Sequence, residues 1–116
     1  MLKSKFRLKN PKAFSATYNN HDTVGNHYFI IYRGRKKTEL STDTKVGFVV
    51  NKKYHKRAVK RNQVKRMFRE VYRRLLNENK IENAQQYLSL VFVIKSACLE
   101  LSFEKCYDMV FKLLNM

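Results

Sequence analysis

The chain has 116 residues and a formal net charge of +16, from 25 Lys and Arg residues against nine Asp and Glu residues. Hydrophobic residues make up 44% of the sequence, which is enough for the core of one domain spanning residues 1–116. No apolar run approaches the ~20 residues that a membrane-spanning helix needs. A polyanion such as RNA or DNA is therefore the expected partner, in preference to a membrane.

The first nine residues carry four cations, Arg7 among them, around Phe6 and Leu8. This pattern fits either a basic arm that leads into the fold or a frayed, solvated terminus. The same segment lacks the apolar stretch of a secretory signal, so we expect a cytoplasmic protein. In that reducing compartment, Cys98 and Cys106 are expected to be buried thiols.

Asn10 and Pro11 predict the start of a helix over residues 11–18, because Asn caps helices and Pro is tolerated at the first helical position. Phe14 and Tyr18 lie four positions apart, so they share one face of this helix. An aromatic pair at this spacing fits a core contact, and it also fits a ligand site.

Two strands are predicted next, over residues 27–33 and 44–51, because apolar side chains alternate in both segments. The order of elements leaves room for one more short strand around residues 28–37. Gly47 lies inside the second strand, where a missing side chain indicates the close approach of another group.

Residues 52–74 form the most basic segment, with eleven Lys or Arg residues and Glu70 as the one acidic residue. A helix is predicted over residues 57–79, because the apolar side chains fall on one arc roughly 100° wide. This apolar arc consists of Val64, Met67, Phe68, Val71 and Leu75. The remaining arc presents cations and one amide. Such a face predicts phosphate binding, and a well-solvated amphipathic helix is the alternative.

Residues 85–95 predict a central strand covered on both faces, because the segment is apolar and rich in β-branched side chains. A closing helix is expected over residues 102–114, with Ser102 as its cap. The resulting order of elements predicts an α+β sandwich, in which helices pack against one sheet. The strand–helix–strand unit over residues 44–95 should give a parallel pair, and general rules would make its crossover right-handed.

The sequence contains no pattern typical of a catalytic or metal-binding site. An independent nuclease needs paired carboxylates that hold Mg²⁺ or a His acid–base pair. The nine acidic residues are scattered, without an Asp-x-Asp or Glu-x-x-His grouping, and the His and Cys residues lack metal-ligand spacing. We therefore expect no catalytic residue and no metal ligand in this chain.

Residues 60–70 read KRNQVKRMFRE, in which Arg-Asn is followed three residues on by a basic pair and three residues later by Arg. A predicted strand ending in Lys52 and Lys53 precedes this motif, and Ala58 lies on the approach to it. The arrangement resembles the RNR motif of the bacterial ribonuclease P protein subunit. The resemblance extends over nearly the whole chain and is strongest over residues 45–72.

This resemblance implies a fold like ribosomal protein S5 domain 2, with a left-handed βαβ crossover in place of the usual right-handed one. It also implies a function. The chain would be the protein component of the ribonuclease P ribonucleoprotein, an endoribonuclease whose catalytic RNA subunit removes the 5′ leader from precursor tRNA. The Mg²⁺ of the holoenzyme would be bound mainly by RNA.

The resemblance also assigns roles to individual residues. RNA binding is expected at Lys52, Lys53, Lys60, Arg61, Asn62, Lys65, Arg66, Arg69 and Arg73. A cleft for the single-stranded leader is expected at Phe14, Tyr18 and Tyr32. Arg7 would add a cation from the basic arm. Asn62 fits either an amide donor to RNA or to a hydrated metal ion, or a hydrogen bond at the helix terminus. The alternative functions are a structural ribosomal RNA-binding protein and a non-specific DNA-compacting protein.

Overall fold

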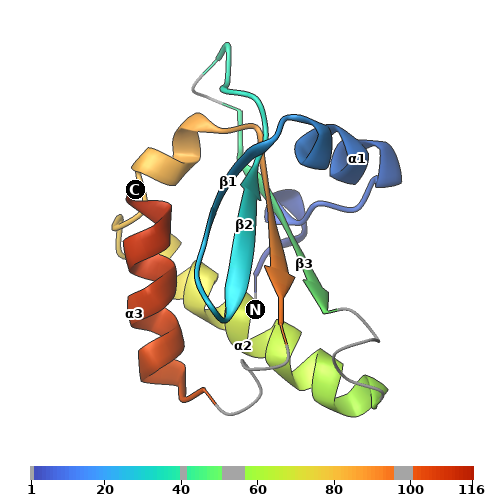
Figure 1. The fold of residues 1–116 in the computed structure, drawn as a ribbon. Helices are drawn as coiled ribbons and strands as arrows, with labels where there is room; N and C mark the ends of the chain where they lie inside the picture. The colour runs from blue at the N-terminus through green and yellow to red at the C-terminus, as the bar shows by residue number, and fades with distance from the viewer. Residues whose placement is uncertain (1, 40–41, 51–56, 96–100) are drawn as a thin grey trace.

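The computed structural model describes residues 2–39, 42–50, 57–95 and 101–116. Its four strands form one sheet in the order β1-β2-β4-β3, in which β3 and β4 are parallel and the other neighbours are antiparallel. Helix α1 lies on one face of the sheet, and α2 and α3 lie on the other (Figure 1). The elements in chain order are η1 (Ser4–Phe6), α1 (Pro11–Asn19), β1 (Asp22–Gly25), β2 (Phe29–Arg33), β3 (Lys45–Val50), α2 (Ala58–Asn77), η2 (Asn83–Gln86), β4 (Ser89–Ile94) and α3 (Phe103–Leu114).

The predicted α+β class is confirmed, and so is the parallel pair on either side of the basic helix. Strand β4 lies between β2 and β3, with four of its six residues buried, as its continuous apolar sequence predicts. Helix α1 begins where the sequence indicates, because the Asn10 side chain accepts a hydrogen bond from the Lys12 N–H at 2.9 Å. Ser102 caps α3 in the same way.

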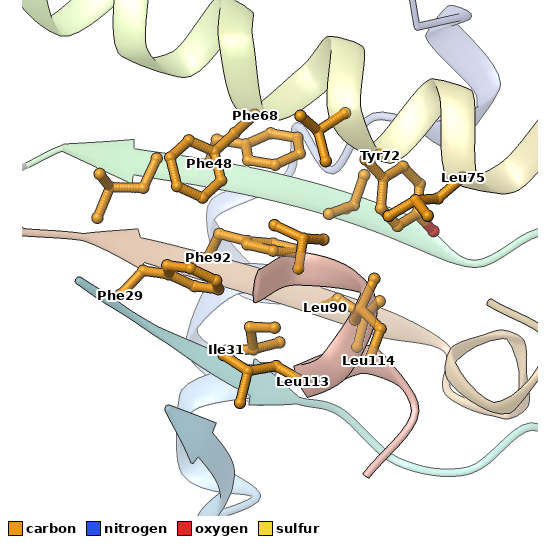
Figure 2. Close-up of a cluster of buried hydrophobic side chains, with 14 of the residues drawn as sticks. Phe29, Ile31, Phe48, Phe68, Tyr72, Leu75, Leu90, Phe92, Leu113 and Leu114 are labelled. Carbon is orange, nitrogen blue, oxygen red and sulfur yellow. The ribbon is translucent and has the colours of Figure 1, made fainter. Parts of the chain in front are cut away.

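The core fills the space between the sheet and helices α2 and α3 (Figure 2). The Phe92 ring of β4 stacks between those of Phe29 and Phe48, at centroid distances of 6.0 and 5.0 Å. The rings of Phe68 and Tyr72, both from α2, meet Phe92 in edge-on contacts. These buried rings hold one side of α2 on the sheet, so the opposite, cationic side faces outwards.

The apolar arc predicted for α2 is confirmed, because four of its residues are buried and Met67 is half-buried. Tyr72 joins this arc and is fully buried, with its hydroxyl oxygen accepting a hydrogen bond from Gln85 Nε2 at 3.2 Å. The helix ends at Asn77. Asn79 then adopts a left-handed conformation, with φ of 55°, which is typical of the turn after a helix.

The N-terminal arm, residues 2–9, is folded against strand β3. Leu2 and Leu8 are only 2% and 8% exposed, and the Leu8 N–H donates to the Val46 carbonyl oxygen at 2.9 Å. Arg7 forms a parallel bridge with Val46. The interpretation of this segment as a frayed terminus is therefore wrong for residues 2–9. The arm covers the backbone edge that β3 would otherwise expose.

Two strand predictions are wrong. The additional strand is β1, which precedes β2 and pairs with it, and it does not lie within residues 28–37. The signal for this hairpin is Asn26, whose side-chain oxygen accepts hydrogen bonds from the backbone N–H groups of Tyr28 and Phe29 and so forms the turn. The last strand begins at Ser89, because residues 85–86 at the start of the predicted strand belong to the short helix η2.

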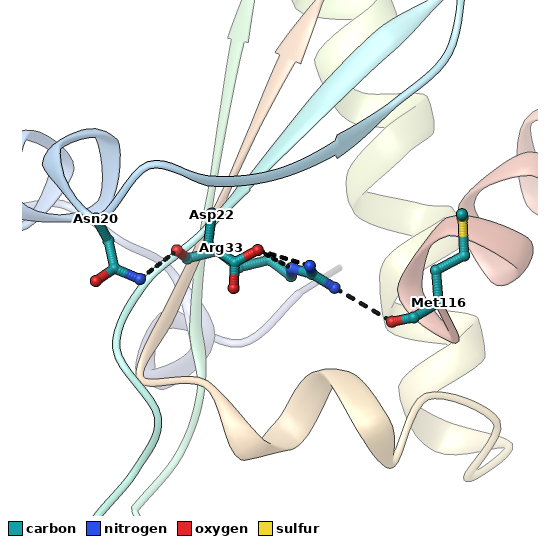
Figure 3. A network of polar contacts seen from close by, with 4 residues as sticks. All are labelled: Asn20, Asp22, Arg33 and Met116. Carbon is teal, nitrogen blue, oxygen red and sulfur yellow. Dashed lines mark hydrogen bonds and ion pairs between the residues drawn. The ribbon is translucent and has the colours of Figure 1, made fainter.

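Arg33 connects the β1–β2 hairpin to the end of the described chain (Figure 3). Its Nε and Nη2 donate to Asp22 Oδ1 at 3.0 and 2.6 Å, and its Nη1 donates to the Met116 carbonyl oxygen at 3.2 Å. Its own carbonyl oxygen accepts a hydrogen bond from Asn20 Nδ2 at 3.1 Å. The guanidinium of Arg33 is thus engaged within the fold.

Candidate nucleic-acid interface

Helix α2 presents the predicted cations on the side that faces away from the core. Lys60 and Arg66 are exposed. The other four cations predicted on this helix are half-buried: Arg61, Lys65, Arg69 and Arg73. The two remaining cations of the prediction, Lys52 and Lys53, lie outside the described residues.

The N-terminal arm brings Arg7 next to this helix face. Arg7, Arg66 and Arg69 line a cavity of about 340 Å³ together with Leu2 and Glu70. Arg7 is held in place because its Nε donates to the Leu2 carbonyl oxygen at 3.1 Å. We call this cavity, with its three guanidinium groups, the arginine pocket.

The arginine pocket concentrates like charge. The pKa of Arg69 is lowered by burial of its guanidinium and by the neighbouring charges of Arg7 and Arg66. The carboxylate in the pocket, Glu70, does not compensate for this charge, because its partner is Arg73: Arg73 Nε donates to Glu70 Oε2 at 3.0 Å, and a second bond joins Arg73 Nη2 to Glu70 Oε1. This pairing lowers the pKa of Glu70 and raises that of Arg73.

A bound anion would relieve the repulsion among the three guanidinium groups. Among the described residues, the three carboxylates that form ion pairs do so with other cations and with none of these three. A phosphate has the charge and the several acceptor oxygens that guanidinium forks match best. The arginine pocket is therefore suited to a phosphate group.

Asn62 lies on the first turns of α2 and is exposed. Its side chain makes no hydrogen bond to the described part of the chain, and the residue at the helix N-cap is Arg57. The structure therefore distinguishes between the two interpretations of Asn62. The structure gives no support to a helix-terminal hydrogen bond, whereas an outward-facing amide among cations remains available to a ligand.

The second predicted site lies on the opposite face of the sheet, under α1. The Phe14 ring packs directly over Gly47 of β3, where a Cβ atom on the glycine would come within 2.5 Å of the ring. This contact confirms the close approach that Gly47 predicts. Thr17, one turn further along α1, is buried and shares a 2.6 Å hydrogen bond between its Oγ1 and Ser89 Oγ of β4. Helix α1 is thus anchored to β3 and to β4.

Tyr18, one turn after Phe14 on α1, contacts Tyr32 of β2. Their ring centroids are 4.8 Å apart with an interplanar angle of 84°, and both side chains are half-buried. Burial, followed by the proximity of Tyr32, raises the pKa of Tyr18. Tyr32 pairs across the sheet with Val91, which pairs in turn with Gly47. The three predicted aromatic residues, including Phe14, therefore lie on one face of the sheet, along the row formed by Tyr32, Val91 and Gly47.

The next row of this face remains partly open. Ile30, Val93 and Val49 are paired neighbours on β2, β4 and β3, and all three are half-buried. Side chains at these positions point to the same face as Tyr32, because they lie two residues along each strand. The face thus combines aromatic rings with an apolar floor, which suits unpaired bases better than a charged helix face does. We call this surface the α1 cleft, after the leader cleft that the resemblance predicts there.

Other polar clusters of the described residues have contacts within the fold. Tyr107 donates its hydroxyl to Glu78 Oε1 at 2.5 Å and accepts from Lys80 Nζ at 3.0 Å, which ties α3 to the end of α2. Over the described parts of the chain, there is no cluster of three or more His, Cys, Asp or Glu side chains able to hold a metal ion. No helix of the described ranges is long and apolar enough to span a membrane.

The sequence predicts the cations of α2 and the aromatic residues but not how they combine. The arginine pocket needs Arg7 beside Arg69, two residues that are far apart in the sequence. The link between them is Leu2, whose burial anchors the arm. The sequence does contain a signal for this arrangement. Leu2 and Leu8 lie on either side of cations in the arm, and apolar residues in these places indicate a segment that packs against the fold.

The fold and these two surfaces define a class: a basic α+β protein built on one mixed sheet, with an outward-facing cationic helix suited to a polyanion. The chain belongs to the ribonuclease P protein family, since the family model described as Ribonuclease P matches residues 2–116. It is accordingly a protein component of the ribonuclease P endoribonuclease.

Individual relatives agree with this membership. The chain is 32% identical over 109 residues to the ribonuclease P protein component of Caldanaerobacter subterraneus, a match that covers 94% of this chain and 86% of that protein. It is 29% identical over 114 residues to the corresponding protein of Alkaliphilus oremlandii, covering 98% and 92% of the two chains.

Solved structures agree on the fold. The RNase P protein from Thermotoga maritima superposes with a TM-score of 0.75 at 23% identity, over 95% of this chain and 96% of that chain. The RNase P protein of Staphylococcus aureus gives a TM-score of 0.72 at 21% identity, over 95% and 93%. The connection from β3 through α2 to β4 belongs to this shared fold, and its left hand stays a prediction of the resemblance.

Proposed function

We propose that this chain assists the catalytic RNA of ribonuclease P in removing the 5′ leader from precursor tRNA, and that it does so by binding two different RNA segments. The cationic face of α2 binds phosphates of the catalytic RNA. The α1 cleft binds the single-stranded leader. The chain itself makes and breaks no bond.

The arginine pocket is the observation that carries the first part of the proposal. Arg7, Arg66 and Arg69 are gathered around one cavity, and the neighbouring Glu70 is paired with Arg73. A fold that keeps three like charges together is stabilised by the anion that neutralises them. RNA phosphates supply such anions at regular intervals, and Lys60 and Lys65 extend the same face along α2.

The α1 cleft supports the second part. Stacking of an unpaired base on an aromatic side chain contributes roughly 1–3 kcal/mol. Tyr18 and Tyr32 are half-buried and able to offer such contacts, whereas Phe14, also half-buried, is packed over Gly47. Only precursor tRNA has a leader, so binding there favours the precursor over the mature product.

The Mg²⁺ of the holoenzyme is assigned to RNA in this proposal. The described residues include no cluster of three or more His, Cys, Asp or Glu side chains, and RNA phosphate oxygens are hard ligands of the kind that Mg²⁺ prefers. The protein contributes positive charge, which lowers the Mg²⁺ concentration needed to bring two polyanions together. The reaction takes place in the cytoplasm, where precursor tRNA is made in bacteria.

The test is cleavage of precursor tRNA by the catalytic RNA at low Mg²⁺, with and without the chain. We expect cleavage to be stimulated by the chain, and the stimulation to shrink as Mg²⁺ is raised. A rate that does not respond to the chain at low Mg²⁺ would refute the proposal. The sequence also left open a structural ribosomal RNA-binding protein, to which the family match lends no support.

A further inference from the structure

A second cavity adjoins the arginine pocket. Its volume is about 390 Å³, within the range of roughly 300–1,000 Å³ that is typical of small-ligand sites. It is enclosed by the N-terminal arm, the last turns of α2, Gln85 of η2 and Asp43 from the segment before β3. We call it the arm cavity. Neither the α1 cleft nor the face of the sheet beneath α1 contributes to it.

The floor of the arm cavity is apolar and partly aromatic. Leu2 is buried, and Phe6 and Leu76 are half-buried. The ammonium group of Lys5 lies 4.9 Å from the centroid of the Phe6 ring. One ligand could therefore contact an aromatic surface and a cation at the same time, and a nucleotide has both an aromatic base and an anionic phosphate.

The wall of the arm cavity carries hydrogen-bonding groups of both kinds. The carboxamide of Gln85 is oriented by its donation from Nε2 to the Tyr72 hydroxyl, which leaves its oxygen as an acceptor. Asn77, at the end of α2, offers a donor and an acceptor, and Asp43 offers a carboxylate. Groups of these kinds recognise the edge of an unpaired base.

The arm cavity and the arginine pocket share a wall. Leu2 lines both, and the Glu70–Arg73 ion pair lies between them, with Glu70 on one side and Arg73 on the other. An RNA strand with one phosphate against the three guanidinium groups can thus place an adjacent base in the arm cavity, on the far side of this wall. Lys3 and Lys5 at the rim suit the phosphate that follows.

We propose that the arm cavity receives one unpaired, extruded nucleotide of the catalytic RNA, whose neighbouring phosphate is held in the arginine pocket. This inference rests on the proposed function. The catalytic RNA is favoured over the leader as the source, because the cavity lies along α2 whereas the α1 cleft is on the other face of the sheet. A nucleotide bound in the arm cavity would fix the position of the protein along the RNA.

Site-specific crosslinking in the reconstituted holoenzyme tests the source of the nucleotide. A photoreactive amino acid in place of Asn77 should crosslink to one unpaired position of the catalytic RNA. The same amino acid in place of Phe111, an exposed residue of α3, is the control and should not crosslink at that position. Crosslinks from position 77 to precursor tRNA, to base-paired RNA or to many scattered positions would overturn the proposal.

A matched pair of variants tests the aromatic contact. Phe6→Leu keeps an apolar side chain on the floor but removes the ring, so we expect binding of the catalytic RNA to weaken about tenfold. Phe111→Leu should bind as the unmodified chain does. Equal binding by the Phe6→Leu chain would refute the stacking contact.

A change in the RNA gives the same test without altering the protein. Removing the base at the crosslinked position should weaken binding of the unmodified chain by about the same factor, and should add little to the effect of Phe6→Leu. Unchanged binding of the abasic RNA would overturn the proposal. If guanosine monophosphate alone blocks the crosslink at low concentration, the site takes a free nucleotide instead. Failure of the chain to bind the catalytic RNA at all would refute the proposed function itself.

Discussion

Arg69 shows how one residue combines burial and charge. It is half-buried, its pKa is lowered by burial and by Arg7 and Arg66, and no described carboxylate is its ion-pair partner. A lysine at this position would give a point charge without the planar fork that matches two phosphate oxygens. We therefore propose that Arg69 contacts RNA, at some cost to the stability of the free protein.

Substituting this guanidinium should change the salt dependence of RNA binding. We expect Arg69→Ala to reduce the slope of log affinity against log salt by about 0.7–0.9 for each phosphate that the side chain neutralises. The measurement is a titration of catalytic RNA at several salt concentrations. Lys112→Ala, an exposed cation of α3, is the matched control. A slope identical to that of the unmodified chain would place Arg69 outside the interface.

The aromatic residues of the α1 cleft lead to a prediction about discrimination. We expect the double variant Phe14→Ala/Tyr18→Ala to lose more affinity for precursor tRNA than for mature tRNA, because only the precursor offers a leader to stack. The measurement compares the two dissociation constants for the holoenzyme. An equal loss for both RNAs would reassign the pair to packing under α1, and Phe111→Ala controls for loss of an aromatic ring elsewhere.

Helix α1 is short, so the hydrogen bonds at its start are important for the stability of the helix and of the α1 cleft. Asn10 accepts the Lys12 N–H and satisfies one of the free donors at the start of the helix. We expect Asn10→Ala to lower the free energy of unfolding by about 0.5–2 kcal/mol, measured by denaturant titration. Asn10→Ser should lose much less stability than Asn10→Ala, since Ser also caps helices. A full effect in both variants would mean that capping is not the cause.

Helix α2 carries a titratable group on its core side. Burial raises the pKa of Tyr72 from 10.0 to about 12, an effect that the hydrogen bond from Gln85 partly offsets. A group whose pKa is higher in the folded than in the unfolded state stabilises the fold. This contribution is complete at pH values below the unfolded pKa, and it is lost as the pH rises towards the folded pKa. Between pH 10 and about 12 stability should thus fall by about 1.4 kcal/mol per pH unit.

The measurement is the free energy of unfolding as a function of pH across that range. Tyr72→Phe removes the group that titrates, so its stability should fall less steeply than that of the unmodified chain. The variant also loses the hydrogen bond from Gln85, and its stability below pH 10 reports that loss separately. Parallel curves for the two chains would assign the alkaline loss to other groups.

The whole molecule carries a charge of +16 on 116 residues, and the fold keeps part of this charge close together. Net charge of this size opposes compaction and favours any state in which anions are bound. We expect sulfate to raise the melting temperature more than sodium chloride does at the same ionic strength. At ten times its dissociation constant, a single bound anion would stabilise the fold by about 1.4 kcal/mol.

Thermal unfolding with the two salts measures this effect. The double variant Arg7→Ala/Arg69→Ala should lose the additional stabilisation by sulfate, because it removes two of the three guanidinium groups of the arginine pocket. Lys105→Ala/Lys112→Ala removes as much charge from α3 and serves as the control. If both double variants respond to sulfate alike, the stabilisation comes from the general exclusion of sulfate from the protein surface.

Several features of this protein are determined by the sequence alone, because they depend on neighbours along the chain. The two sides of α2 follow from helical periodicity, the start of α1 follows from Asn10 and Pro11, and the buried strand β4 follows from its apolar run. Local spacing also gives the motif in residues 60–70 that identifies the family. The hairpin with β1 was missed because its turn depends on one side chain, Asn26, within a polar segment.

Only the tertiary structure decides which distant residues meet. Burial of Leu2 and the pairing of the arm with β3 bring Arg7 to Arg69, and helix α1 places Phe14 over Gly47. Helical spacing allows Arg73 to pair with Glu70. Which carboxylate a cation pairs with, however, depends on the other groups around it. Periodicity fixes the direction of a side chain on its own element, whereas packing of the whole core fixes its partner on another.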